Sequence, residues 1–227
     1  MSLDLFVTAA GTEIGKTFVA ERLIHECRER NFSCDALKPI VTGFDDSPQS
    51  DTARLLTALD LPINEHTVDA CSPWRFDDPL SPNMAASRVG QRIVLNELIK
   101  FCKRPSEARL RLIEGIGGVM VPINDHETTL DWMAVLGVPV ILVVGSYLGA
   151  ISHALTAYEA LRTRNVAVQG IIVNESPEQP VPLEETARTI EYFCEPVPIA
   201  CLERLDAAHD THDTAADASL LQSLHLV

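Results

Sequence analysis

Basic residues are scarce in this sequence. Lysine and arginine together number 18, against 32 aspartates and glutamates, so the 227 residues carry a formal net charge of −14. A protein this acidic repels the phosphate backbone of nucleic acids and the anionic lipids of a membrane surface, so we expect neither as a partner. An anionic small ligand would need a local concentration of positive charge on such a protein.

The sequence also lacks the spacings and runs that are typical of several other classes of protein. Its six cysteines include no C-x-x-C pair, which disfavours thioredoxin-like chemistry and the common zinc sites. No apolar run approaches the ~18 residues of a membrane-spanning helix, and the first residues include no basic segment of a signal peptide. We therefore expect a cytoplasmic protein whose reduced thiols act as small hydrophobic groups.

The chain does contain an average fraction of hydrophobic residues, 46%, arranged in apolar runs that alternate with helical patterns. This fraction can build a sizeable core. The length suits one domain or a tight pair of domains, and we expect a single domain over residues 1–227. Strands are expected at residues 3–8, 36–41, 110–113, 139–144, 170–173 and 197–201, and helices at residues 16–30, 51–59, 93–103, 152–163 and 183–192.

The alternation of strands and helices predicts an α/β fold. Strands joined by helices form βαβ units with right-handed crossovers, so we expect a mostly parallel β-sheet flanked by helices on both faces, a three-layer sandwich. Residues 60–90 are rich in proline and aspartate, and we expect them to form a long excursion over the strand ends rather than a separate domain. Residues 203–217 are expected to form a polar tail.

The strongest motif lies between the first expected strand and the first expected helix. It reads GTEIGKT over residues 11–17, and its end resembles that of a P-loop, although alanine replaces the first glycine of the standard pattern. Gly15 would let the backbone approach a phosphate at the helix N-terminus, Lys16 would reach the β- and γ-phosphates, and the Thr17 hydroxyl would bind Mg²⁺. A strand–turn–helix junction that merely needs glycines is the alternative. We predict nucleotide binding and a P-loop NTPase-like fold.

A P-loop requires an acidic partner for its metal ion, and two residues are candidates. Glu114 ends the expected strand at residues 110–113, where the carboxyl ends of parallel strands present ligands. Asp51 opens the expected helix at residues 51–59, where it could instead be an ordinary N-cap or first-turn acid. Both suit Mg²⁺, which takes one or two carboxylates besides phosphate and water oxygens.

A series of motifs, taken together, resembles the dethiobiotin synthases, ATP-dependent cyclo-ligases of biotin synthesis that form C–N bonds. The resemblance extends over most of the chain and depends on the order and spacing of the pieces. They are Phe6–Thr8, Thr12–Thr17, Lys38-Pro39, Thr42-Gly43, Ser50-Asp51, Ser81-Pro82, Glu114-Gly115, Gly117-Gly118, Pro139–Val144, Leu148-Gly149 and Asn174. The chain departs from the usual family pattern at Ala9, Asn83, Ile116 and Ser152.

The resemblance implies a particular reaction, in which 7,8-diaminononanoate, CO₂ or bicarbonate, and ATP with Mg²⁺ give dethiobiotin, ADP and phosphate. One amine captures CO₂ as a carbamate, a carbamate oxygen takes the γ-phosphoryl group, and the second amine closes the cyclic urea as phosphate leaves. No protein nucleophile is required, so the enzyme would act by positioning and positive charge. The resemblance also implies a homodimer with its sites at the interface.

The resemblance further implies roles for individual residues. Lys16 and Lys38 are the implied catalytic residues, although on the residues alone Lys38 could be a strand-end surface lysine. The implied metal ligands are Thr17, Asp51 and Glu114. The implied nucleotide contacts are Thr12, Glu13, Ile14, Gly15, Lys16 and Thr17, with Asn174 as the reader of adenine and Val197, Pro198 and Ile199 closing its pocket. The implied substrate contacts are Lys38, Thr42, Gly117, Gly118 and, from the neighbouring subunit, Leu148, Gly149, Ala150 and Ser152.

A partitioning-type P-loop ATPase that acts as a nucleotide-dependent switch is the main alternative. Such proteins carry an additional lysine early in the loop, whereas this chain has Ala-Ala-Gly-Thr at residues 9–12. The acidic composition also disfavours a partnership with DNA. ATP turnover that requires a diamine and bicarbonate would separate the two functions.

Overall fold

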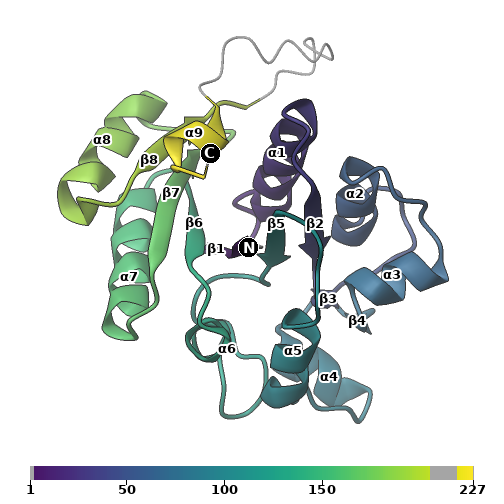
Figure 1. Ribbon diagram of the computed structural model, residues 1–227. Coiled ribbons are helices and arrows are strands. Elements are labelled where there is room, and N and C mark those ends of the chain that lie inside the picture. The colour runs from purple at the N-terminus through teal and green to yellow at the C-terminus, as the bar shows by residue number, and fades with distance from the viewer. Residues whose placement is uncertain (1–2, 205–218, 227) are drawn as a thin grey trace.

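The computed structural model describes residues 3–204 and 219–226, in which two β-sheets are packed among helices. The larger sheet has six parallel strands in the order β2-β5-β1-β6-β7-β8 (Figure 1). Its strands are β1 (Leu3–Ala9), β2 (Cys34–Leu37), β5 (Leu110–Glu114), β6 (Val140–Gly145), β7 (Val168–Asn174) and β8 (Ile199–Leu202). This sheet and the helices around it confirm the α/β fold predicted from the sequence.

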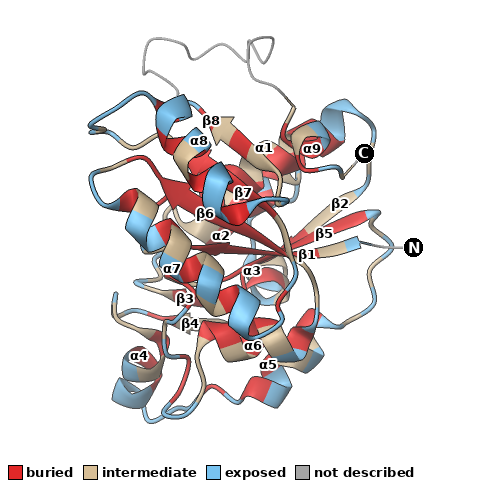
Figure 2. Cartoon of the chain, turned by 90° about the vertical axis from the view of Figure 1, so that its left-hand side faces the viewer, coloured by how far each residue is buried: buried red, intermediate tan, exposed pale blue. Residues whose placement is uncertain are grey.

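Helices cover both faces of the larger sheet (Figure 2). One face packs against α1 (Lys16–Glu29), α2 (Asp51–Ala58) and α9 (Leu220–Ser223), and the other against α5 (Leu95–Cys102), α6 (Thr129–Leu136), α7 (Ala150–Thr163) and α8 (Leu183–Cys194). Successive residues of β1 point to opposite faces, so Leu5 joins the core under α1 while Phe6 joins the other core, edge-on to Trp132. Burial on both faces explains why the strands are almost wholly apolar.

The expected strand at residues 36–41 is in fact interrupted. β2 ends before Lys38, and β3 (Ile40–Thr42) belongs to a separate two-stranded sheet. Proline lacks an N–H group, so Pro39 cannot continue the ladder of hydrogen bonds, and the backbone N–H of Lys38 donates to the carbonyl of Cys71 at 3.1 Å. The interruption places Lys38 at the carboxyl end of β2, at the same edge of the sheet as the motif after β1.

Residues 60–90 contain more regular structure than the sequence predicted. They form α3 (Glu65–Cys71), β4 (Trp74–Phe76) and α4 (Pro82–Arg88), and β4 pairs in parallel with β3. Phe76 and Ala86 belong to the same buried cluster as Phe6 of the larger sheet. The segment therefore contributes to the core on that face of the sheet.

Most other boundaries lie within a few residues of those expected. The helix expected at residues 152–163 begins at Ala150, and the strand expected at residues 197–201 is β8, which begins at Ile199. Helices α6 and α9 were not predicted. Residues 205–218, which include most of the expected polar tail, lie outside the described residues. Within the described ranges, no helix is both long and apolar enough to cross a membrane.

Candidate active site

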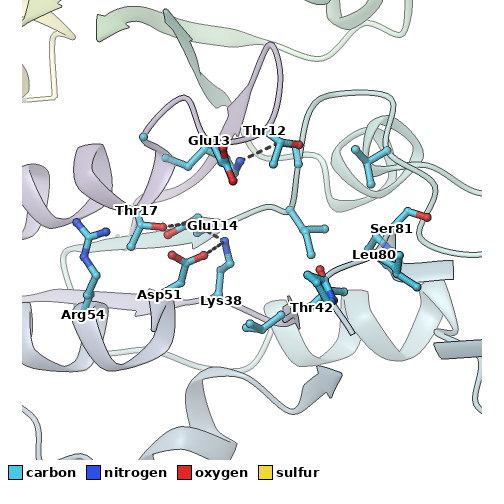
Figure 3. A pocket seen from close by; sticks show the side chains of 18 of the residues that line it. Thr12, Glu13, Thr17, Lys38, Thr42, Asp51, Arg54, Leu80, Ser81 and Glu114 are labelled. Carbon is cyan, nitrogen blue, oxygen red and sulfur yellow. Dashed lines mark hydrogen bonds and ion pairs between the residues drawn. The ribbon is translucent and has the colours of Figure 1, made fainter. Parts of the chain in front are cut away.

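A cavity of about 790 Å³ lies at the carboxyl ends of β1, β2 and β5 (Figure 3). Ligand sites of open parallel sheets lie at this edge, because the loops that follow the strands converge there. Its lining includes half of the residues expected to act on a nucleotide, a metal ion or a substrate. These are Thr12, Glu13, Gly15, Lys16, Thr17, Lys38, Thr42, Asp51, Glu114 and Gly117.

The loop between β1 and α1 has the form that a phosphate site requires. Gly15 adopts a left-handed conformation with φ of 95°, and a Cβ atom there would lie 2.3 Å from Nδ2 of Asn174, so a larger residue does not fit. No side chain of the described residues caps the N-terminus of α1, and its first turn contains no acidic residue. The free N–H groups and the positive end of the helix dipole are therefore available to an anion.

Lys16 is nearly buried, with 8% of its surface exposed. Its Nζ donates a hydrogen bond to the carbonyl of Gly117 at 2.9 Å. Burial and the positive charge of Lys38 lower the pKa of Lys16 to about 8. A polyanion bound in the cavity would favour the charged form of Lys16, because it would supply the negative charge that the side chain lacks here.

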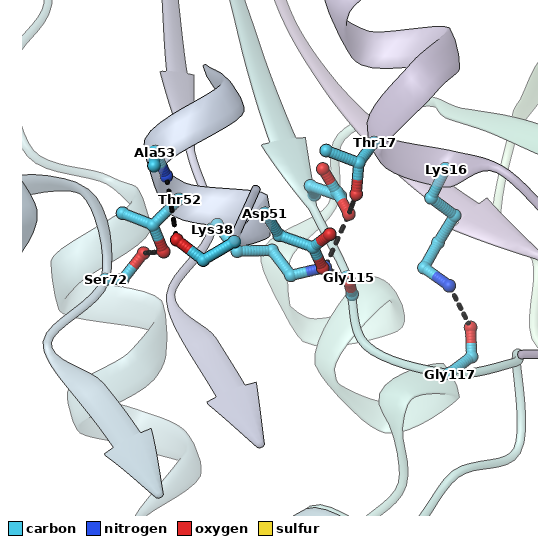
Figure 4. A network of polar contacts seen from close by, with 11 residues as sticks. Lys16, Thr17, Lys38, Asp51, Thr52, Ala53, Ser72, Gly115 and Gly117 are labelled. Atoms are coloured by element: carbon cyan, nitrogen blue, oxygen red, sulfur yellow. Dashed lines mark hydrogen bonds and ion pairs between the residues drawn. The ribbon is translucent and has the colours of Figure 1, made fainter. Parts of the chain in front are cut away.

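Lys38 is buried at the centre of a network of polar contacts (Figure 4). Its Nζ lies 2.5 Å from Oε1 of Glu114, 3.1 Å from Oδ2 of Asp51 and 3.0 Å from the carbonyl of Gly115. Burial lowers the pKa of Lys38, but the two carboxylates outweigh burial and the pKa is raised. With 3% exposure it is not a surface lysine, and it keeps its positive charge inside the cavity.

Thr17, Asp51 and Glu114 converge around the same point. The Thr17 hydroxyl donates to Oε1 of Glu114 at 2.8 Å. Asp51 lies at the first position of α2, but the cap of that helix is Ser50, which accepts from the backbone N–H of Ala53. The Asp51 carboxylate faces Lys38 instead: burial raises its pKa, Lys38 lowers it, and the net pKa is lowered.

This donor set fits a magnesium ion. Oε2 of Glu114 is buried and has no hydrogen-bond partner among the described residues, so one oxygen is left for a ligand. Two carboxylates and a hydroxyl are the hard oxygen donors that Mg²⁺ takes alongside phosphate and water. Among the described residues, no group of three or more His, Cys, Asp or Glu side chains is arranged to hold a metal ion.

A second cavity of about 400 Å³ adjoins the first beyond Gly15. Its lining includes four of the expected nucleotide contacts: Glu13 and Gly15, which also line the first cavity, and Ile14 and Asn174, which do not. The Asn174 side chain donates through Nδ2 to the carbonyl of Ile14 at 2.8 Å, which ties the end of β7 to the phosphate loop. The carbonyl oxygen of the Asn174 side chain is then available as an acceptor for a ligand. Glu175, Ser176, Pro177 and Arg204 complete this side of the cavity.

The structure does not bring Val197, Pro198 and Ile199 to this cavity. They precede or begin β8, and the carbonyl of Pro198 accepts from the N–H of Ile171 near the middle of β7. In the parallel register Leu202 is the residue of β8 that lies beside Asn174. The residues that follow β8, Arg204 among them, therefore reach the cavity, whereas those before the strand lie towards the opposite edge of the sheet.

The expected substrate contacts divide into three groups. Lys38, Thr42 and Gly117 line the first cavity. Gly118 does not line the cavity. A Cβ atom at this position would lie 3.3 Å from the backbone of Gly11, so the glycine allows close packing against the phosphate loop. The residues expected to act from a neighbouring subunit do not line either cavity of this chain, and the first of them is 85% exposed. They are Leu148, Gly149, Ala150 and Ser152, at the start of α7.

Sequence reasoning gave no role to several residues that line the cavities. Ser81 and Pro82 are part of the resemblance but have no function assigned from it, and no role in the site was expected for Pro79, Leu80 and Val121. Arg54 and Phe18 were also missed, although Arg54 follows Asp51 by three residues and so shares its face of α2. That spacing is a signal the sequence did contain.

Comparison with known proteins assigns the family. Residues 4–211 match the family described as AAA domain. The ATP-dependent dethiobiotin synthetase BioD of Acidiphilium cryptum (strain JF-5) is 44% identical over 190 residues, which cover 82% of this chain and 85% of the relative. The BioD of Caulobacter sp. (strain K31) is 46% identical over 200 residues, which cover 86% and 85%. The chain belongs to the ATP-dependent dethiobiotin synthetase family.

Solved structures share the fold at much lower identity. The septum site-determining protein MinD of Pyrococcus horikoshii OT3, complexed with Mg-ADP, superposes with a TM-score of 0.54 at 18% identity over 89% of this chain and 82% of its own. A ParA family ATPase of Chlorobium tepidum TLS gives a TM-score of 0.56 at 13% identity over 98% and 92%. These similarities confirm the P-loop ATPase fold alone, and membership in the synthetase family favours the ligase over the partitioning-type switch.

Proposed function

We propose that this protein uses ATP to join CO₂ to 7,8-diaminononanoate and closes the ring, which gives dethiobiotin, ADP and phosphate. In this proposal residues 1–227 form a single catalytic domain. An amine of the substrate attacks CO₂ and loses a proton, forming a carbamate. A carbamate oxygen attacks the γ-phosphorus as ADP leaves, which gives a carbamic–phosphoric anhydride. The second amine attacks the carbonyl carbon, phosphate departs, and the cyclic urea forms with loss of a proton.

In this proposal the two buried lysines neutralise and position the reacting groups. Lys16 exchanges the carbonyl of Gly117 for the β- and γ-phosphates. Lys38 keeps its charge, so it acts as a fixed hydrogen-bond donor to the carbamate and the transferred phosphoryl oxygens rather than as a base. Electrostatic stabilisation and orientation are the main contributions a protein can make to phosphoryl transfer.

The proposal includes one Mg²⁺ held by Thr17, Asp51 and Glu114. Oε2 of Glu114 is the free oxygen that supports this assignment. When bound, the ion would neutralise charge on the β- and γ-phosphates. Asp51, which is partly exposed and whose pKa is lowered, is ionised at neutral pH and ready to contribute its carboxylate.

We further propose that the protein is a homodimer whose partner subunit binds the substrate carboxylate. Leu148 is a large hydrophobic residue left 85% exposed, and Gly149 precedes the uncapped N-terminus of α7. Such a terminus suits an anion, and an exposed leucine beside it suits a contact with a second chain.

We also propose a cytoplasmic location for the protein. Six free thiols are consistent with the reducing cytoplasm as the compartment.

The observation that carries the proposal is the meeting of a phosphate loop, two buried lysines and two carboxylates in one cavity. The test is a phosphate-release assay with Mg-ATP and bicarbonate, in the presence and absence of 7,8-diaminononanoate, followed by detection of dethiobiotin by mass spectrometry. We expect phosphate release to require the diamine and to match dethiobiotin in amount. Phosphate release that ignores the diamine would instead support a nucleotide-dependent switch.

A further inference from the structure

Four residues line both cavities and so form the boundary between them. They are Glu13, Gly15, Phe18 and Arg54. The first cavity holds the lysines and carboxylates, and the second holds Asn174 at the end of β7. A nucleotide with its terminal phosphates in the first cavity and its base in the second must cross this boundary with its α-phosphate and ribose.

Arg54 is the cationic member of the boundary. Its Nε donates to Oε1 of Glu21 at 2.9 Å, and its Nη2 pairs with the other oxygen of the same carboxylate. This two-pronged contact between α2 and α1 fixes the plane of the guanidinium group. Nη1 has no hydrogen bond within the described part of the chain, and the side chain retains 33% exposure.

The charges of the residues at the boundary between the cavities also favour a cation there. Lys16 and Lys38 both lie further into the first cavity, where Lys38 is already paired with Glu114 and Asp51. Glu13, on the other side of the boundary, would repel a phosphate. A positive charge at this point would offset that repulsion and add to the N–H groups of the phosphate loop, and Arg54 alone among the four boundary residues carries one.

We propose that Arg54 binds the α-phosphate of the nucleotide through Nη1, while Glu21 holds its guanidinium group in place. This inference rests on the proposed use of ATP, and it adds a nucleotide-positioning residue on α2 to those of the phosphate loop. An arginine suits the role better than a lysine, because its planar fork keeps two nitrogens on Glu21 and presents the third to a phosphate oxygen.

The binding of Mg-ADP and of adenosine to matched variants tests the proposal. Arg54→Gln removes the guanidinium group. Arg28→Gln is the matched control, because Arg28 also joins α1 to the end of α2, through the carbonyl of Ala58 and the carboxylate of Asp60, but lines neither cavity. Mg-ADP is measured by calorimetry, adenosine by competition with a fluorescent ADP analogue, and thermal stability is followed in parallel. We expect Arg54→Gln to weaken Mg-ADP binding about tenfold, the size of one partly exposed charge-assisted contact, and to change adenosine binding less than twofold.

The control variant distinguishes a direct contact with the phosphate from a general loss of stability. Both variants should lose similar thermal stability, but Arg28→Gln should keep Mg-ADP affinity within about threefold of the wild type. Unchanged Mg-ADP binding by Arg54→Gln would overturn the proposal and leave the proposed function standing. The proposal would also be overturned if Arg54→Gln weakened adenosine binding as much as Mg-ADP binding, or if both variants lost the same Mg-ADP affinity. A wild-type protein that fails to bind Mg-ADP would contradict the proposed function itself.

Discussion

Replacing the phosphate-loop lysine should make this protein more stable while abolishing its activity. Burial and the charge of Lys38 lower the pKa of Lys16 from 10.5 to about 8, so the nucleotide-free fold disfavours the charged form. At 1.36 kcal/mol per pKa unit, that is on the order of 3 kcal/mol of lost stability at neutral pH. Methionine has a similar shape without the charge. Allowing about 1 kcal/mol for the lost contact with Gly117, Lys16→Met should gain about 2 kcal/mol.

The sign of the pH dependence follows from the same shift. The pKa of Lys16 is lower in the folded state than in the unfolded state. The loss of folding stability caused by its charge is therefore complete below pH 8 and disappears as the pH rises towards 10.5. The advantage of Lys16→Met should therefore be greatest near pH 7 and shrink between pH 8 and 10.

Thermal unfolding of the nucleotide-free protein measures the effect. A gain of about 2 kcal/mol corresponds to a rise in Tm of about 4–8 °C for a chain of this size. Lys100→Met, at an exposed lysine of α5, is the matched control and should change stability by less than about 0.5 kcal/mol. A Lys16→Met protein with a lower Tm than the wild type at pH 7 would refute the claim that the charge of Lys16 destabilises the nucleotide-free fold and is present for function.

Three further substitutions test other parts of the site. Lys38→Gln should lower kcat for dethiobiotin formation by about 10²–10³-fold, as expected for loss of one preorganised donor, while Mg-ADP still binds; a loss of less than tenfold in kcat would contradict its role. Glu114→Gln should weaken the dependence of ADP binding on Mg²⁺, measured by calorimetry with and without a chelator, because one carboxylate ligand is removed; an unaltered dependence would place the metal elsewhere. Asn174→Ala should reduce the preference for ATP over GTP in the phosphate-release assay; an unchanged preference would mean that the base is read by other residues.

The sequence predicted the site best where residues of distinctive chemistry lie at the carboxyl end of an expected strand or after the loop that follows it. Glu114 ends β5, and Lys16 and Thr17 begin α1 after the loop that follows β1. The structure brings the three together because the carboxyl ends of parallel strands share one edge of the sheet. Lys38 was also placed at a strand end, although the role of Pro39 in ending β2 was not foreseen. In each case local sequence determines the position in the fold.

The same rule explains why some expected nucleotide contacts lie away from the second cavity. Val197 and Pro198 precede β8, so a parallel sheet places them away from the edge where the phosphate loop lies, and the residues that follow the strand lie at that edge. Arg204 is such a residue. Residues 205–218, which follow it, lie outside the described residues.

Short or uniformly apolar elements were missed for a different reason. Helix α6 is apolar on most of its surface, so it lacks the polar–apolar periodicity that identifies a surface helix. Helices α3 and α4 have seven residues each, too few for a periodic pattern to stand out. Tertiary packing, which the sequence pattern does not report, determines where such segments are helical.

Transfer of an oxygen atom tests the proposed reaction most directly. If a carbamate oxygen attacks the γ-phosphorus and the second amine then displaces phosphate, one oxygen of CO₂ must leave with that phosphate and the other must stay in the ring carbonyl. Freshly dissolved ¹⁸O-labelled CO₂, given with Mg-ATP and 7,8-diaminononanoate, should yield phosphate that carries one labelled oxygen, as measured by mass spectrometry. Phosphate released without label, alongside labelled dethiobiotin, would contradict the carbamic–phosphoric anhydride on which the account depends.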